Sequence, residues 1–263
     1  MVSIVICSRN PDLLGRCLRG IAREPGRIRH ELIVVHHLTS NEVDDSRMRT
    51  LIAAAGASSV EFEAAFHFSV MNNLGAKNAR GEILLFLNDD VTPLAPDWLE
   101  ALAVQVQRPS VAIAGAKLLY PSGLLQHAGV VVGIGDGCGH AGRFQHDVPH
   151  FPWLQLARDV SAVTGACLAI RREVFGQLGG FDRGFPVNYN DVDLCLRARQ
   201  AGYRVINEPA AVLRHDECQT RVGGTTFDER KAFLTRWRSV VDAGDPFYNS
   251  NLTRLNETAG LGE

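Results

Sequence analysis

The 263-residue sequence has no excess of charge of either sign, because 27 lysine and arginine residues balance 29 aspartate and glutamate residues. A net charge of −2 gives no reason to expect binding to nucleic acid through bulk charge. No stretch reaches the roughly 18 consecutive apolar residues that span a bilayer. The first residues also lack the basic region, long apolar run and cleavage site of a signal peptide. A cytoplasmic protein is therefore expected.

Paired cysteine motifs are absent as well. None of the six cysteines forms a C-x-x-C pair, and most lie inside apolar stretches. Buried free thiols in a reducing compartment explain this pattern. Hydrophobic residues make up 46% of the chain and charged residues 21%, an ordinary globular balance. A disulfide-stapled miniprotein and a disordered chain are therefore excluded.

Short apolar runs alternate with helical patterns in the first half of the chain. The patterns predict strands at 2–7, 31–35 and 83–87 and an extended piece around 60–62. They also predict three helices: one begins at Pro11, one follows a cap at Asn41, and one follows a cap at Ser69 and ends at Gly81. Such alternation predicts a mostly parallel α/β sheet flanked by helices. Ligands bind beyond the carboxyl ends of the strands in sheets of this kind.

The second half of the chain is less regular. Helices are expected at 97–107, 190–200 and 227–241, and strands at 111–116 and 130–132. The stretch at 162–170 is again apolar, 205–213 is extended, and a long glycine-rich loop is expected at 133–153. Within that loop, Gly137–Gly142 matches G-x-G-x-x-G, but no helix pattern follows it, so a dinucleotide site is not expected. Its cysteine and histidines match no standard zinc spacing. A loop at the rim of a pocket is the preferred interpretation.

Polar side chains follow two of the predicted strands. Ser8, Arg9 and Asn10 come after the first strand, and Asn88-Asp89-Asp90 come after the strand at 83–87. Adjacent carboxylates repel each other unless they are solvated or neutralised, and Mg²⁺ or Mn²⁺ would neutralise them. A turn combined with a helix cap explains the same residues without any ligand.

Two later clusters could likewise have either a structural role or a role in binding and catalysis. Asn190-Asp191-Val-Asp193 begins a predicted helix, where acidic residues commonly cap, but an ionised Asp191 would also serve as a general base. His215 follows an apolar strand and could ligate a metal or simply bond a backbone carbonyl. Six arginines crowd the first thirty residues, and the solvated face of a helix explains them better than a patch for phosphate or anionic lipid.

Taken together, these pieces resemble the inverting nucleotide-sugar glycosyltransferases of family 2, which have the GT-A fold, and among them a rhamnosyltransferase-like subgroup. The resemblance covers about residues 2–250. It is carried by the order and spacing of segments at 2–10, 73–75, 79–82, 84–90, 115–123, 126–129, 164–172, 179–182, 190–195 and 245–249. It implies one GT-A domain over 1–263, with a nucleotide-binding half at 1–110, an acceptor and catalytic half at 111–250, and a tail at 251–263.

The resemblance also assigns roles to individual residues. Asp90 matches the metal ligand, His215 matches a histidine that helps hold the metal or the diphosphate, and Asp191 matches the catalytic base. The residues expected to border the nucleotide are Ser8, Arg9, Asn10, His36, Asn73, Asn88 and Asp89. Here His36 replaces an aspartate that usually accepts a hydrogen bond from the pyrimidine, Asn88 replaces the first acid of the D-x-D motif, and Cys7 replaces a proline.

The activity implied is transfer of a sugar from a UDP- or dTDP-sugar to a hydroxyl of a glycan or lipid-linked acceptor, with Mg²⁺ or Mn²⁺, in surface polysaccharide synthesis. A lipid-linked acceptor would suit peripheral contact of the early arginines with a membrane. Two alternatives stay open. A sugar nucleotidyltransferase would share the sheet and the metal, although its glycine-rich phosphate loop is absent after the first strand. A non-catalytic nucleotide- or glycan-binding relative would accommodate the altered His36-His37 segment.

Overall fold

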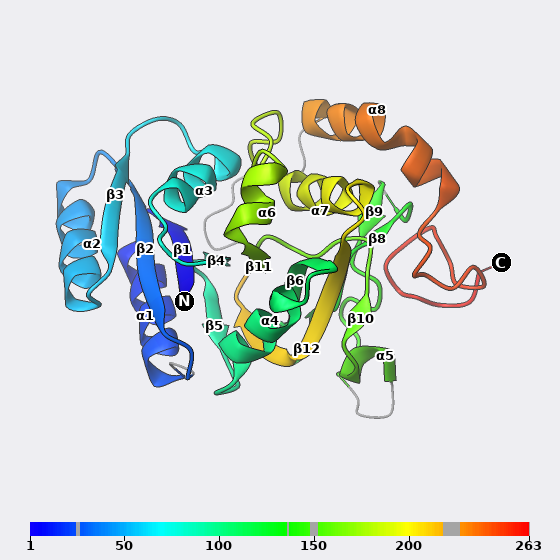
Figure 1. The fold of residues 1–263 in the computed structure, drawn as a ribbon, viewed down its shortest axis with the longest axis horizontal. Coiled ribbons are helices and arrows are strands. Elements are labelled where there is room, and N and C mark those ends of the chain that lie inside the picture. The colour runs from blue at the N-terminus through cyan, green and yellow to red at the C-terminus, as the bar shows by residue number, and fades with distance from the viewer. Residues whose placement is uncertain (25–26, 136, 148–151, 218–226, 263) are drawn as a thin grey trace.

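The computed structural model describes residues 1–24, 27–135, 137–147, 152–217 and 227–262 (Figure 1). The first half of the chain alternates strands and helices as β1 (Val2–Ser8), α1 (Pro11–Arg23), β2 (His30–His37), α2 (Glu42–Ala54), β3 (Ser58–Phe62), α3 (Phe68–Lys77), β4 (Ile83–Asn88), β5 (Val91–Pro93) and α4 (Trp98–Gln107).

The second half contains β6 (Val111–Leu119), β7 (Leu125–His127), β8 (Val131–Val132), β9 (Cys138–Gly139), α5 (Pro152–Gln155), β10 (Arg158–Asp159), β11 (Cys167–Arg171), α6 (Arg172–Gln177), α7 (Asn190–Gln200), β12 (Arg204–His215) and α8 (Phe227–Ala243). The predicted alternation of strands and helices is confirmed in the first half. In the second half, α7 begins and ends at the predicted residues.

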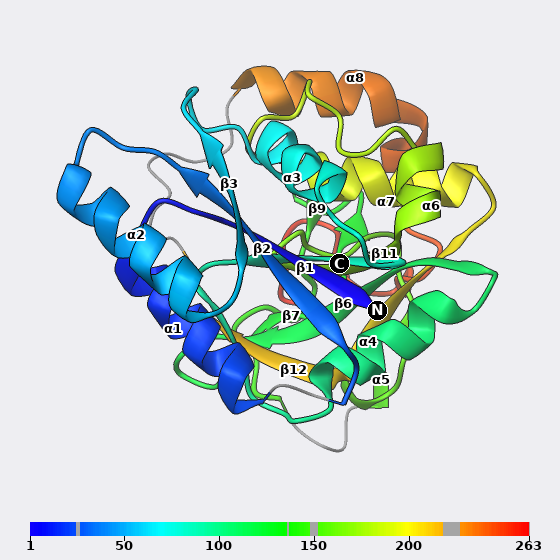
Figure 2. The ribbon, with the colours of Figure 1, turned by 60° about the vertical axis from the view of Figure 1, so that its left-hand side comes forward.

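A ten-stranded mixed sheet forms the centre of the molecule. The strand order is β10-β12-β6-β11-β4-β1-β2-β3, with β5 paired to β12 and β7 paired to β6. Strands β3, β2, β1 and β4 run parallel, and β11 is antiparallel to both of its neighbours, β4 and β6. Helices α1, α2 and α4 cover one face, while α3, α6, α7 and α8 cover the other (Figure 2).

Each face of the sheet has its own hydrophobic core. Along β2, Val34 packs with the α1 and α2 side, whereas Val35 packs with the α3 side. Adjacent side chains of a strand point to opposite faces, so a sheet covered on both faces needs continuous apolar runs. This explains why β1, β2 and β4 are apolar without alternation.

Both predicted ends of the helix between Ser69 and Gly81 are wrong. Helix α3 begins at Phe68 after a His67 cap, and Ser69 lies inside it with its hydroxyl donating to the Phe185 carbonyl at 2.6 Å. The helix ends at Lys77, well before Gly81. The apolar stretch at 162–170 forms a strand only from Cys167 onward, because the preceding residues turn toward α7.

The cysteines and arginines behave as the sequence indicated. The five described cysteines are free thiols, three of them buried and two half-buried, and Cys218 lies outside the described residues. All six early arginines are exposed. No helix in the described part of the chain is both long enough and apolar enough to cross a membrane. The division into 1–110, 111–250 and 251–263 stays a prediction.

Candidate active site

A cleft of about 870 Å³ opens at the carboxyl ends of the parallel strands. Cys7 of β1 pairs with Asn88 of β4, and Ser8 pairs with His36 of β2, so these strand ends meet at one edge of the sheet. The opposite wall comes from the N-terminus of α7, the turn before β11 and the loop that follows β8. The cleft therefore lies between the two halves of the sequence.

Seven of the ten site residues predicted from sequence line this cleft. They are Ser8, Arg9, Asn88, Asp89, Asp90, Asp191 and His215. Asp90 and Asp191 come from opposite halves of the chain and still face one cavity. The remaining three, Asn10, His36 and Asn73, do not belong to its lining.

His215 reaches Asp90 because the end of β12 pairs with β5, which places His215 opposite Val91. The His215 Nε2 atom lies 3.1 Å from Asp90 Oδ1. Its Nδ1 atom lies 2.7 Å from Gln126 Oε1. Because an amide oxygen can only accept, His215 carries a proton on Nδ1, and in that neutral tautomer Nε2 holds a lone pair.

Asp90 and His215 fit a hard divalent cation. Asp90 Oδ1 is buried and has no hydrogen-bond partner among the described residues, so with His215 in its neutral tautomer two acceptor atoms face each other. Adjacent ligands of an octahedral Mg²⁺, each about 2.1 Å from the ion, lie about 3.0 Å apart. The described residues hold no cluster of three or more histidine, cysteine or acidic ligands. A cation here would therefore complete its shell with substrate and water oxygens.

Asp89 forms the floor of the cleft beside Asp90. It is 8% exposed, and Ser8 Oγ donates to its Oδ2 at 2.6 Å. Burial raises the pKa of Asp89 to about 7, with the Asp90 charge adding to the rise and the Ser8 hydroxyl opposing it. Two adjacent carboxyl groups in this position are costly to ionise together, and a bound cation would lower that cost.

Asp191 occupies the first turn of α7 on the far wall. Its Oδ2 accepts the Gly165 backbone N–H at 2.7 Å, and its Oδ1 accepts the Val192 backbone N–H at 2.8 Å. A Cβ atom on Gly165 would lie 3.0 Å from the Phe68 ring and 3.4 Å from Asp191 Cβ, so glycine permits the backbone of residue 165 to approach both side chains. The two bonds orient the carboxylate and leave lone pairs free for a proton.

Asp193, two residues further along α7, has a different role. It is fully buried and accepts hydrogen bonds from Arg197 and Arg236 at 2.8 Å and from the Trp237 indole at 3.0 Å. These contacts fasten α8 to α7. The Asn190–Asp193 cluster therefore divides between one carboxylate in the cleft and one that holds the fold together.

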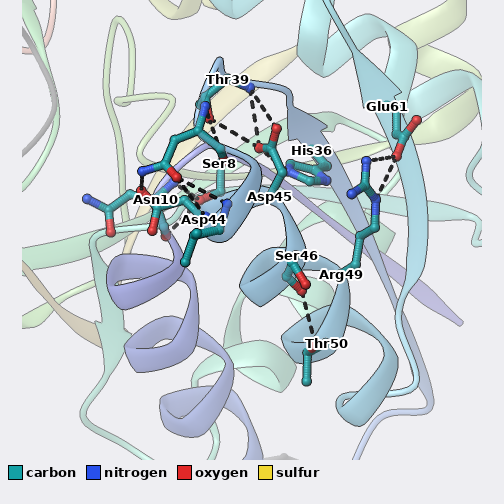
Figure 3. Close-up of polar contacts among 12 residues, drawn as sticks. Ser8, Asn10, His36, Thr39, Asp44, Asp45, Ser46, Arg49, Thr50 and Glu61 are labelled. Atoms are coloured by element: carbon teal, nitrogen blue, oxygen red, sulfur yellow. Dashed lines mark hydrogen bonds and ion pairs between the residues drawn. The ribbon is translucent and has the colours of Figure 1, made fainter.

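The two histidines at the end of β2 face opposite sides of the sheet. His36 is fully buried, and its Nε2 lies 3.1 Å from Asp45 Oδ1 of α2 (Figure 3). His37 instead lines the cleft, and its Nε2 bonds to the Ala64 carbonyl at 2.9 Å. His36 thus lies outside the cleft lining, and the neighbouring His37 faces the cavity instead.

Asn10 and Asn73 serve local structure. The Asn10 side chain accepts the Asp12 and Leu13 N–H groups at 3.0 and 3.1 Å and so caps α1. The Asn73 amide donates to the Phe181 carbonyl at 2.8 Å and accepts its N–H at 3.0 Å. Both side chains are occupied away from the cleft. On the same helix Asn72 lines the cleft instead.

Sequence reasoning missed a polar cluster on the cleft wall that the second half of the chain forms. Arg143 donates to both oxygens of Glu217 at 2.9 and 2.8 Å, and Glu257 accepts the His140 backbone N–H at 2.6 Å. All four line the cleft together with Asn256. The segment expected to be a simple tail at 251–263 thus contributes to the cavity wall. No periodicity in the sequence signals this contact between segments more than a hundred residues apart.

Comparison with known proteins identifies the family. The chain matches the family described as glycosyltransferase like family 2 over residues 1–239, and it belongs to that family. It is 37% identical over 96% of its length to an uncharacterised protein of Sinorhizobium fredii, covering 29% of that protein. It is 39% identical over 74% of its length to an O-antigen biosynthesis protein of Myxococcus xanthus, covering 16% of that protein.

A shorter match links the chain to a rhamnosyltransferase. Over 24% of its length it is 38% identical to an N-acetylglucosaminyl-diphospho-decaprenol L-rhamnosyltransferase of Mycobacterium tuberculosis, covering 20% of that enzyme. The chain therefore spans less than a third of each of these relatives.

Solved structures confirm the predicted GT-A fold. GalNAc-T7, crystallised with UDP, GalNAc and Mn²⁺, matches 92% of the chain and 51% of its own at a TM-score of 0.68 and 17% identity. A mannosyltransferase from Pyrobaculum calidifontis in complex with GDP-Man and Mn²⁺ matches 92% of the chain and 72% of its own at a TM-score of 0.61 and 17% identity.

Proposed function

We propose that this chain is an inverting, metal-dependent glycosyltransferase that moves a sugar from a nucleoside-diphosphate sugar to a hydroxyl of a glycan or lipid-linked acceptor in surface polysaccharide synthesis. One observation carries the proposal: Asp90, with His215 beside it, and Asp191 line the same cleft from opposite walls. A reacting sugar would sit between them. The family membership and the Myxococcus xanthus relative support the same reading.

Asp90 and His215 are the residues that would hold Mg²⁺ or Mn²⁺. Both solved neighbours contain Mn²⁺ with a nucleotide or nucleotide sugar, and both atoms here are acceptors held 3.1 Å apart. Such a cation stabilises the negative charge that grows on the leaving diphosphate. Arg9 at the rim and Asn88 and Asp89 on the floor would border the diphosphate and ribose.

His37 supports a donor with a uracil or thymine base. The Ala64 carbonyl can only accept, so His37 carries its proton on Nε2, and Nδ1 is an acceptor. That Nδ1 atom is buried and has no partner among the described residues. Burial lowers the pKa of His37, which keeps the acceptor available. Uracil and thymine carry an N3–H that would donate to Nδ1 once a small rotation of the His37 ring turned that atom toward the cleft, whereas cytosine has no proton on N3.

The reaction is a single displacement. Asp191 accepts the proton of the acceptor hydroxyl as that oxygen attacks the anomeric carbon. A new carbon–oxygen bond forms while the bond to the diphosphate oxygen breaks on the opposite face, and the nucleoside diphosphate leaves with the electron pair. Because attack and departure occur on opposite faces, the anomeric configuration inverts. A positioned general base typically contributes about 10²–10⁴-fold in rate.

Thermal unfolding with a panel of nucleotide sugars tests the proposal. A UDP- or dTDP-sugar with Mn²⁺ is expected to raise Tm, and the rise should shrink when EDTA removes the metal. Incubation with acceptor glycans should release nucleoside diphosphate. Release of pyrophosphate from a nucleoside triphosphate and a sugar 1-phosphate would instead indicate a nucleotidyltransferase. Stabilisation without turnover on any acceptor would favour a non-catalytic binding protein, and no stabilisation by any nucleotide sugar would refute the proposal.

A further inference from the structure

Two histidines, His127 and His140, contact each other at the cleft wall that the second half of the chain forms. His127 at the end of β7 is 1% exposed and lies beneath His140, which lines the cleft. Their rings meet edge to face with centroids 5.0 Å apart. The two Nδ1 atoms are 2.8 Å apart, so one must donate and the other accept.

The backbone around His127 decides the direction of that hydrogen bond. The Gly129 and Thr164 N–H groups both point at His127 Nε2, at 3.3 and 3.4 Å. A backbone N–H can only donate, so Nε2 must hold a lone pair and the His127 proton must lie on Nδ1. His127 therefore donates to His140, whose proton is left on Nε2.

The position of His140 is fixed at two further points. Its backbone N–H donates to Glu257 Oε1 at 2.6 Å. A Cβ atom on the preceding Gly139 would lie 2.7 Å from the same carboxylate oxygen, so glycine permits the contact. The structure gives His140 Nε2 no hydrogen-bond partner among the described residues. The result is a fixed N–H donor that lines the cleft and has no partner in the described part of the chain.

The charges around this donor favour one class of ligand. The carboxylates of Asp191, Glu217 and Glu257 all act on the electrostatics of His140. The guanidinium of Arg143, which also acts on His140, is already bonded to both oxygens of Glu217. A phosphate would be repelled by this surplus of negative charge, whereas an uncharged hydroxyl can accept from a neutral N–H.

We propose that His140 is a saccharide-binding residue whose Nε2–H donates to a sugar hydroxyl, and that His127 is the positioning residue that fixes its tautomer. This inference rests on the proposed function, because it assigns a ligand within the same cleft. The hydroxyl belongs either to the transferred sugar or to the acceptor sugar. Burial lowers the pKa of His140 and that of His127 still further, in agreement with a neutral pair.

Nitrogen-15 NMR of histidine-labelled protein tests the tautomers directly, without any ligand. Long-range proton–nitrogen spectra should show His127 protonated on Nδ1 and His140 protonated on Nε2. His140→Gln and His127→Asn assign the signals, and His146→Gln, at an exposed site of the same loop, is the matched control. The opposite tautomer at His140 would overturn the proposal.

Titration of the same sample identifies the source of the hydroxyl. With Mg²⁺, UDP alone should leave the His140 ring signals in place. A shift caused by UDP- and dTDP-hexoses identifies the transferred sugar, whereas a shift caused only by methyl hexosides added to the UDP complex identifies the acceptor sugar. No shift with either, although UDP binds, would overturn this inference and leave the proposed function standing. Failure of UDP to bind would instead overturn both.

Variants of His140 and His127 distinguish a role in saccharide binding from a role in stabilising the fold. His140→Gln keeps a donor near Nε2 and should retain the affinity for the responding saccharide, whereas His140→Leu should weaken it about three- to tenfold, the effect of one neutral hydrogen bond. UDP affinity should not change in either variant. At His127, Asn can still donate to His140 and should preserve its tautomer, whereas Phe should not. Equal loss of UDP and saccharide binding in both His140 variants would overturn the assignment.

Discussion

Asp191→Asn removes the proposed base with the smallest change in shape. In the wild type, each carboxylate oxygen accepts one backbone N–H, from Gly165 at 2.7 Å and from Val192 at 2.8 Å. Asparagine has one oxygen and one NH₂ group, so it can satisfy only one of these donors. The other N–H would face a second donor. Leaving one such group unsatisfied costs about 1–3 kcal/mol.

The two consequences of this substitution differ in size and can be measured separately. Loss of the base should lower kcat about 10²–10⁴-fold. Loss of one hydrogen bond should lower Tm by roughly 2–10 °C in a chain of this size. The Kd of the nucleotide sugar should stay within a few-fold, because no described contact ties Asp191 to the nucleotide side of the cleft.

The assay is nucleoside diphosphate release with donor and acceptor, alongside donor binding by calorimetry. Asp193→Asn is the matched control, since it makes the same substitution two residues along α7, at a carboxylate bound to Arg236 and Trp237. That variant should lose more Tm yet keep kcat within a few-fold in the folded protein. Full transfer by Asp191→Asn, or equal loss of kcat in both variants, would refute the base assignment.

Four further outcomes follow from the structure. Asp90→Asn should abolish the extra stabilisation that Mn²⁺ adds to UDP, about 2.7 kcal/mol at one hundred times Kd, with Tm as the readout. UDP should bind at least about tenfold more tightly than CDP, because CDP leaves the acceptor of His37 unpaired, and equal affinities would exclude that contact. Gly75→Ala should cost about 1–3 kcal/mol in denaturant unfolding, since its Cβ would lie 2.3 Å from a methyl group of Val5. Burial lowers the pKa of His127, so the unfolded chain takes up a proton first; below about pH 6.5 the wild type should therefore lose up to about 1.4 kcal/mol of stability per pH unit relative to His127→Asn.

The sequence predicts the parts of this site that have a local signal. Asn10 sits before Pro11 and caps α1, and the apolar run of β4 leads directly into Asp89 and Asp90, so both features are visible within a few residues. The start of α7 at Asn190 and the position of Asp191 follow from the same kind of local pattern. These elements form as predicted because capping and burial act over short stretches of chain.

Which of His36 and His37 faces the cleft could not be predicted from a local pattern of this kind. A strand covered on one face alternates apolar and polar side chains, and the alternation tells which face is inside. Strand β2 is buried on both faces, with Val34 and Val35 both at 0% exposure, so its sequence carries no alternation to read. Only the packing of α2, which supplies Asp45 to His36, decides which histidine faces the cleft.

Strand β7 links the two walls of the cleft in a way that no motif indicates. Gln126 and His127 are neighbours, yet each orients a different histidine of the cleft. Gln126 accepts from Nδ1 of His215 and leaves a lone pair toward Asp90, whereas His127 donates to Nδ1 of His140 and leaves an N–H free. The same ring atom is thus given opposite roles by two adjacent residues. We propose that one histidine would bind a cation and the other would donate to a hydroxyl, so we expect a displacement of β7 to disturb metal binding and sugar binding together.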